Sequence, residues 1–117
     1  MAQFLVTGGS GFIGSHLCRK LLGEGHGVRV LDNLSSGKRA NLSDVAGDID
    51  FHEADLRDED AVQRAVKGVE YILHHAAVAS VQTSVEEPLK EQQINSVGTL
   101  NLLEAARQAS VRRLVFA

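Results

Sequence analysis

Short apolar runs alternate with longer amphipathic segments along the 117 residues of this chain. Each short run is bounded by glycine or polar residues, which is typical of buried β-strands. Helices are predicted between most of these strands, so the pattern indicates an α/β domain with a parallel sheet and right-handed crossovers. The expected architecture has three layers, α/β/α, around a five-stranded sheet of order 3-2-1-4-5. The predicted strands cover residues 4–6, 28–31, 49–53, 69–74 and 111–117.

Three segments carry apolar residues at helical spacing. The first apolar stripe begins at Ile13, directly after a glycine-rich stretch. The second helix is predicted to follow Asp58 as its N-cap, with acidic residues in the first turn, and to stop at Gly68. The third covers residues 89–109 and has an apolar surface wide enough to touch more than one neighbour. A glycine inside it, Gly98, predicts close approach of another backbone or of a cofactor.

The glycine-rich stretch between the first strand and the first helix contains Gly8, Gly9, Gly11 and Gly14. Three of them fit the spacing G-x-G-x-x-G, and the strand before them and the helix after them supply the context that this motif needs. Glycine admits positive φ angles and close ligand approach, and a helix N-terminus attracts anions. The turn is therefore predicted to bind the phosphates of a dinucleotide, the alternative being a flexible turn.

Asp32 ends the second predicted strand, about 20 residues after the glycine turn, where a dinucleotide fold binds the adenosine ribose. Its charge would repel a 2′-phosphate, which favours NAD over NADP. The alternative is that Asp32 only caps a turn, and the nearby cations Lys38 and Arg39 leave a role for a 2′-phosphate open. Residues 33–48 are polar and turn-rich, and they predict a loop with at most a short helix over 42–45. Within it, three small residues are candidates to line the ribose: Ser35, Ser36 and Gly37.

Further candidates lie at the ends of the third and fourth strands. Asp55 follows the third strand at its carboxyl end, the edge at which open α/β sheets bind ligands. The neighbouring His74 and His75 would point to opposite faces of a strand, so they predict no metal site. The small side chains of Ala76 and Ala77 leave space for a cofactor or for close packing of a helix.

The composition of the chain argues against some classes of binding partner but does not change the predicted fold. The chain is 44% hydrophobic and 23% charged with a net charge of −3, which gives no reason to expect nucleic acid or an anionic membrane as a partner. No apolar run approaches the roughly 20 residues of a membrane span, and no signal-like segment opens the chain. A cytoplasmic location is expected. The single cysteine, Cys18, excludes a disulfide and is predicted to pack in the core.

The assembled motifs resemble the NAD-dependent epimerase/dehydratase family of extended short-chain dehydrogenases/reductases, typified by UDP-glucose 4-epimerase. The resemblance runs through the whole chain in the order of the family. It implies a Rossmann-like NAD(P)-binding fold with NAD as the cofactor. The segments that carry the resemblance are TGGSGFIGSHL at 7–17, DNLSSGK at 32–38, DLRD at 55–58, HHAA at 74–77 and NSVGTLNLLEAA at 95–106.

The resemblance also implies a role for individual residues along the cofactor. The residues implied to bind NAD are Gly8, Gly11, Phe12, Ile13 and Gly14 at the pyrophosphate, Asp32, Asn33, Ser35, Ser36 and Gly37 at the adenosine ribose, Asp55 and Leu56 at the adenine, Ala76 and Ala77 along the middle of the cofactor, and Asn95 at the nicotinamide half.

The chain departs from the family in its catalytic residues. Family members carry a Ser or Thr after the fifth strand, a Tyr-x-x-x-Lys pair and a carboxyl-terminal sugar-nucleotide domain. Here the only tyrosine is Tyr71, and His75 follows it four positions later. We expect one NAD(P)-binding Rossmann-like domain over residues 1–117, truncated before the catalytic residues, that binds NAD without catalysing the family reaction.

The sequence leaves two alternatives open. One is a minimised structural unit that folds without holding a cofactor, and the other is a regulator that senses NAD(H) through its oligomeric state. In all cases the last strand and uncovered helix surface are expected to promote self-association.

Overall fold

The computed structural model describes residues 2–34, 38–75 and 93–116. Five parallel strands form one sheet of order β3-β2-β1-β4-β5, so the predicted order is confirmed. Because all strands run in one direction, their carboxyl ends lie along one edge. The strands are β1 (Gln3–Thr7), β2 (Gly27–Asp32), β3 (Ile49–Glu53), β4 (Tyr71–His74) and β5 (Arg113–Phe116).

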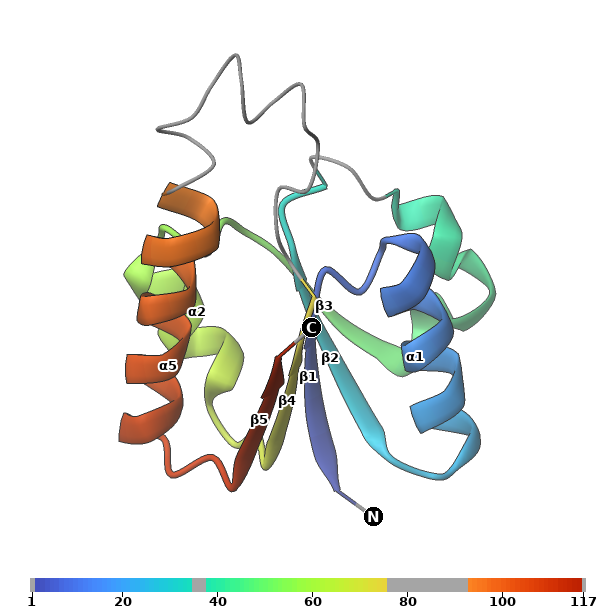
Figure 1. Cartoon of the computed structure of the whole chain (residues 1–117). Coiled ribbons are helices and arrows are strands. Elements are labelled where there is room, and N and C mark those ends of the chain that lie inside the picture. The colour runs from blue at the N-terminus through green and yellow to red at the C-terminus, as the bar shows by residue number, and fades with distance from the viewer. Residues whose placement is uncertain (1, 35–37, 76–92, 117) are drawn as a thin grey trace.

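Helices cover both faces of the sheet, which gives the expected three layers (Figure 1). α1 and η1 lie on one side, and α2 and α5 lie together on the other. The helices are α1 (Phe12–Gly23), the 3₁₀ helix η1 (Arg39–Asp48), α2 (Glu59–Val66), the π-helical turn η2 (Gln93–Val97) and α5 (Gly98–Gln108).

The core is divided by the sheet into two clusters, as the alternation of side chains along β1 requires. Leu5 points to the α2 and α5 side and packs in a cluster with Ile72 and Leu102. Val6, its neighbour, points to the α1 side and packs with Val30 and Cys18. The predicted core position of Cys18 is confirmed, and burial raises the pKa of its thiol to about 11.

The second helix begins as predicted. The Asp58 side chain accepts a hydrogen bond from the N–H of Ala61 at 3.2 Å, and two acidic residues occupy the first turn. Gly68 follows the helix with φ of +77°. At the carboxyl end, Arg29 of β2 donates to the carbonyls of Ala65 and Lys67, both at 2.7 Å, and so satisfies acceptors that the helix leaves open.

Several predicted boundaries are wrong. The segment expected to be a loop with a short helix forms the ten-residue 3₁₀ helix η1, which buries Leu42 and is held to α1 by the ion pair of Arg19 with Asp44 at 2.9 Å. Since only one side chain of η1 is buried, its sequence has no repeating apolar pattern from which the helix could be predicted. β4 begins two residues later than predicted, at Tyr71, and β5 begins at Arg113.

The last helix differs from its prediction in two respects. Its described part opens with the π-helical turn η2 and continues as α5, while residues 89–92 lie outside the described residues. The apolar surface is only partly covered, because Leu102 packs in the core whereas Leu100 and Leu103 are exposed. Gly98 is the first residue of α5 and is buried; the close approach of a backbone or cofactor there stays a prediction.

Among the described residues, no helix is long and apolar enough to cross a membrane.

Candidate functional site

The glycine turn between β1 and α1 is closed by backbone hydrogen bonds. Gly8 has φ of +71°, a conformation that L side chains rarely adopt, and its N–H donates to the carbonyl of Leu31 in β2 at 2.9 Å. The N–H of Gly11 donates back to the carbonyl of Gly8 at 3.1 Å. The turn is thereby fixed to the carboxyl ends of two adjacent strands.

Gly14 allows the first turn of α1 to sit directly against this loop. A Cβ at Gly14 would lie 2.2 Å from the carbonyl oxygen of Gly8, and a Cβ at Gly9 would lie 2.7 Å from Val30 Cγ2. Both distances are shorter than real contacts of a Cβ. The motif glycines thus permit the close packing of turn, helix and strand that the fingerprint predicts.

The amino end of α1 presents N–H groups that the helix itself leaves unbonded. Gly11 is the N-cap residue and, having no side chain, makes no side-chain cap hydrogen bond. The N–H groups of the first turn, starting at Phe12, have no partner inside the helix and are suited to an anion. Ile13 is 60% exposed and Phe12 77% exposed, so the apolar stripe that begins at Ile13 is not buried at its start. The buried side of α1 instead includes Ser15, Cys18 and Leu21.

Asp32 lies at the end of β2, buried against the glycine turn, with 8% of its surface exposed. Its Oδ2 accepts hydrogen bonds from both the N–H and the hydroxyl of Ser10, the former at 3.1 Å. Its Oδ1 accepts from the N–H of Leu34 at 2.8 Å. The phosphate-binding turn and the ribose-binding carboxylate that the sequence predicts are therefore in direct contact.

Ser10 also anchors the segment that follows β2. Its carbonyl accepts from the N–H of Lys38 at 3.2 Å and from Nδ2 of Asn41 at 2.7 Å. Arg39, the second cation near Asp32 in sequence, has its guanidinium 4.3 Å from the ring centre of Phe51 in β3. Nothing in the sequence distinguishes Ser10 from other turn serines, and it was absent from the predicted site.

Asp55 follows β3 and is held by two partners. Arg57 makes an ion pair with it at 2.6 Å, and Nδ2 of Asn33 donates to it at 3.5 Å. The hydrogen bonds and charge of Arg57 lower the pKa of Asp55 to about 2. The contact of Asn33 with Asp55 joins the residues predicted at the ribose to those predicted at the adenine.

Leu56 is buried, and its carbonyl is held by the long helix on the same side of the sheet. Nδ2 of Asn101 in α5 donates to this carbonyl at 3.0 Å. Asn101 thus fixes the loop after β3.

A chain of hydrogen bonds links the ends of β1 and β4 to η2. Thr99 donates to the carbonyl of Asn95 at 2.7 Å and therefore accepts from Nε2 of His74 at 2.9 Å. Nδ1 of His74 accepts from the hydroxyl of Thr7 at 2.5 Å, and this hydroxyl accepts from the N–H of His75 at 3.0 Å. The bond to Thr99 places a proton on Nε2, and Nδ1 accepts from Thr7 when the imidazole is neutral. Burial lowers the pKa of His74, in agreement with this form.

The described residues include no group of three side chains arranged to hold a metal ion. The predicted site residues Gly8, Gly11, Asp32, Asn33, Asp55 and Leu56 come together around three neighbouring strand ends, and Asn95 is joined to this edge through Thr99 and His74. Five predicted site residues lie outside the described residues: Ser35, Ser36, Gly37, Ala76 and Ala77.

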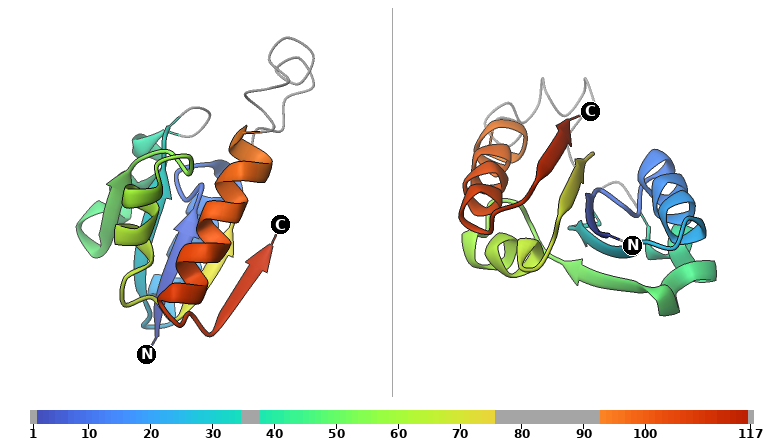
Figure 2. Two further views of the ribbon diagram at one scale, coloured as in Figure 1. Left: turned by 90° about the vertical axis from the view of Figure 1, so that its left-hand side faces the viewer. Right: turned by 90° about the horizontal axis from the view of Figure 1, so that it is seen from below.

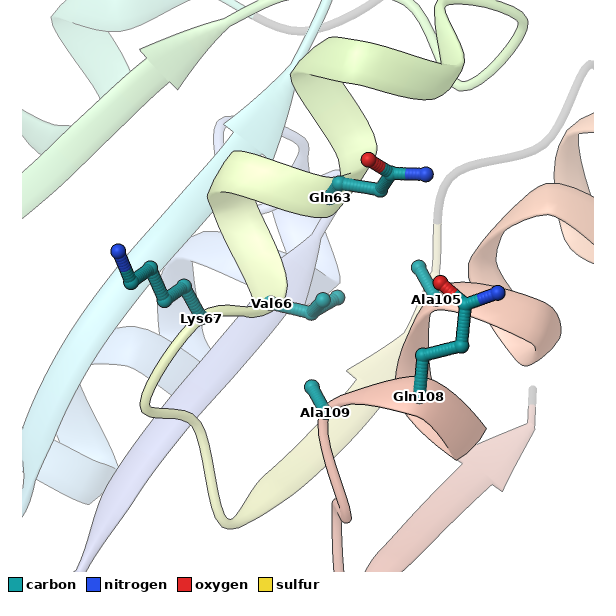
Figure 3. A pocket seen from close by; sticks show the side chains of 6 residues that line it. All are labelled: Gln63, Val66, Lys67, Ala105, Gln108 and Ala109. Carbon is teal, nitrogen blue, oxygen red and sulfur yellow. The ribbon is translucent and has the colours of Figure 1, made fainter.

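A hollow of about 190 Å³ lies elsewhere, between the carboxyl ends of α2 and α5 (Figure 3). Those helix ends lead into the starts of β4 and β5, so the hollow is at the edge of the sheet opposite the glycine turn. It belongs to helix packing rather than to the candidate site. Its lining residues are Gln63, Val66, Lys67, Ala105, Gln108 and Ala109.

Comparison with known proteins agrees with this geometry. The NAD dependent epimerase/dehydratase family matches residues 4–117. The chain belongs to this family.

Relatives in the family include enzymes of two reaction types. The chain is 43% identical to a putative UDP-glucose 4-epimerase of Methanocaldococcus jannaschii over 98% of its own length and 37% of that protein. It is similar in structure to the UDP-glucose 4-epimerase of Thermus thermophilus in complex with NAD, with 49% identity, a TM-score of 0.89 and coverage of 97% of this chain and 36% of that one.

A dTDP-glucose 4,6-dehydratase, DesIV of Streptomyces venezuelae with NAD bound, is 39% identical with a TM-score of 0.89, covering 96% of this chain and 38% of that one. The chain spans little more than a third of the length of these three relatives. The same part of the fold therefore occurs in an epimerase and in a dehydratase.

Proposed function

We propose that this chain is the NAD-binding portion of a nucleotide-sugar epimerase or dehydratase similar to UDP-glucose 4-epimerase. One observation carries the proposal: the buried Asp32 carboxylate is hydrogen-bonded to the glycine turn at the uncapped amino end of α1. A dinucleotide needs both an anion site for its diphosphate and an acceptor for its ribose hydroxyls, and here they adjoin.

The residues present fit the cofactor in distinct ways. The first-turn N–H groups of α1 would hold the pyrophosphate, and the glycine at position 14 keeps that turn close to Gly8. Asp32 and Asn33 would bind the ribose, while Asp55 and Leu56 would flank the adenine. When bound, NAD would supply the hydride-transfer chemistry on which the family reaction depends.

The proposal separates binding from catalysis. The sequence contains no Tyr-x-x-x-Lys pair, and Tyr71 is a strand residue stacked on Phe4 with ring centres 5.1 Å apart. We expect the 117-residue chain to bind NAD without converting a nucleotide sugar.

Calorimetric titration with NAD, and separately with NADP, tests the proposal. Saturable binding of NAD and weaker binding of NADP is expected, because the Asp32 carboxylate opposes a 2′-phosphate. Asp32→Ala should weaken NAD binding by roughly 1 to 3 kcal/mol through loss of the ribose hydrogen bond, whereas Asp48→Ala, at an exposed position in η1, should not. A folded chain that binds neither dinucleotide would contradict the proposal and favour a purely structural unit.

A further inference from the structure

Ser10 makes four hydrogen bonds that join three segments around the glycine turn. Its N–H and hydroxyl both donate to Oδ2 of Asp32, and its carbonyl accepts from Lys38 and Asn41. The residue is fully buried. Every polar atom of Ser10 is therefore committed, and half of its hydrogen bonds go to a single carboxylate oxygen.

These contacts limit what Asp32 can still accept. A carboxylate has about four acceptor positions, two on each oxygen. Ser10 occupies both positions on Oδ2, and the N–H of Leu34 occupies one on Oδ1 at 2.8 Å. Counting the described residues alone, one acceptor position remains, on Oδ1.

Resting on the proposed function, we infer that Ser10 is a positioning residue that sets the preference for NAD over NADP. It holds the Asp32 carboxylate so that Oδ1 accepts one ribose hydroxyl and the negative charge stays where a 2′-phosphate would stand. Without the Ser10 hydroxyl, the carboxylate keeps the N–H donors of Ser10 and Leu34 but loses one of its two bonds on Oδ2, so its orientation is less firmly fixed. The cations Lys38 and Arg39, which follow in the same segment, then favour a 2′-phosphate.

Ser10→Ala tests this role because it removes the hydroxyl and keeps the backbone donor. Calorimetry should show the Kd for NAD raised about tenfold and the Kd for NADP raised much less, so that the preference for NAD falls about tenfold. Ser43→Ala is the matched control: Ser43 is an exposed serine of η1, and its replacement should leave both Kd values within about twofold.

A double-mutant cycle with Asp32→Asn shows whether Ser10 acts through Asp32. In the Asp32→Asn background, Ser10→Ala should change NAD affinity less than about twofold, because the group that it positions has lost its charge. Circular dichroism during heating checks that each variant is folded. If Ser10→Ala loses its cooperative transition, Ser10→Cys, which keeps a weaker donor of similar size, replaces it under the same criteria.

The outcomes distinguish this inference from the proposed function. If the wild-type chain binds NAD and the Ser10 variant keeps the same preference for NAD over NADP, the role of Ser10 is wrong and the proposed function stands. If Ser10→Ala lowers NAD affinity equally in the wild-type and the Asp32→Asn backgrounds, the role of Ser10 is also wrong, because Ser10 would then act only on the fold. Failure of the wild-type chain to bind NAD overturns both.

Discussion

Asp55 shows how the environment of one residue decides its role at the candidate site. Its position after β3 fits either a ligand contact or a structural anchor. The ion pair with Arg57 at 2.6 Å and the hydrogen bond from Asn33 make the side chain part of the wall of the site. Arg57 also donates its backbone N–H to Asp55 at 2.8 Å, which fixes the turn. A ligand would therefore meet a carboxylate that is already neutralised.

The pairing of Asp55 predicts a pH dependence of stability. Arg57 lowers the pKa of Asp55 to about 2, below the value of the unfolded chain, so the native state binds this proton less readily. The stabilisation is complete above about pH 4 and is lost as the pH falls through about 2. Melting temperatures of wild-type protein and Asp55→Asn should differ near neutrality and converge in acid.

Asp48→Asn, at an exposed position of η1, is the control and should follow the wild-type curve. A gap between wild type and Asp55→Asn that stays constant from about pH 7 to about pH 2 would contradict this assignment.

Individual site residues could be predicted from the sequence where a motif fixes their place along the chain. Asp32 was found by its distance from the glycine turn. Ser10 was not, because its role comes from a contact between residues 22 positions apart that no periodic pattern reveals. The hydrogen bond of Asn101 to the Leu56 carbonyl could not be predicted either, because the sequence does not name the partner of a polar residue on a helix.

Among the elements, α1 depends most directly on the glycine turn. The helix begins at Phe12 with a glycine N-cap, and its first turn lies against the Gly8 carbonyl. The N–H of Ser15 completes this contact by donating to the carbonyl of Gly11 at 2.9 Å. The orientation of the helix toward the strand ends is thus set by backbone atoms.

Gly14→Ala should destabilise the protein and weaken NAD binding together. The new Cβ would lie 2.2 Å from the Gly8 carbonyl oxygen, so α1 or the turn must move, at a cost of about 2 to 3 kcal/mol. Gly23→Ala is the matched control at the other end of α1, where a Cβ meets nothing within 4 Å. It should be neutral or stabilise by up to about 1 kcal/mol. Chemical unfolding measures both, and equal stability of the two variants would be evidence against close packing at Gly14.

Elements whose apolar residues repeat at regular spacing were predicted well, and elements with few buried side chains were not. The capping residue Asp58 and the apolar side of α2 located that helix within a residue. η1 was largely missed because its one buried residue, Leu42, gives no repeating pattern. The π-helical turn η2 was missed because its sequence fits an α-helix equally well.

For the described part of the molecule, two apolar surfaces remain uncovered. There β5 is an edge strand whose one neighbour in the sheet is β4 (Figure 2). Val115 and Phe116 of β5 are exposed. On α5, Leu100 and Leu103 are also exposed. Exposed apolar surface and unpaired strand edges favour association between copies.

The chain is therefore expected to self-associate at micromolar concentration. Light scattering after size-exclusion chromatography should give a mass above 12.6 kDa that rises with concentration. Val115→Lys should reduce association if the strand edge is responsible, and Leu100→Lys should do so if α5 is. A constant monomer mass over the micromolar range would refute the expectation.

The carboxyl edge of the sheet, around the glycine turn, is the proposed NAD site. Amide NMR spectra recorded during a titration with NAD can verify this, because they locate the ligand on the chain. Binding at this edge should produce saturable shifts at residues 8–14, 32–34 and 54–57. Saturating NAD that leaves these amides unchanged, or that shifts mainly Gln63 and Gln108 at the opposite edge, would contradict it.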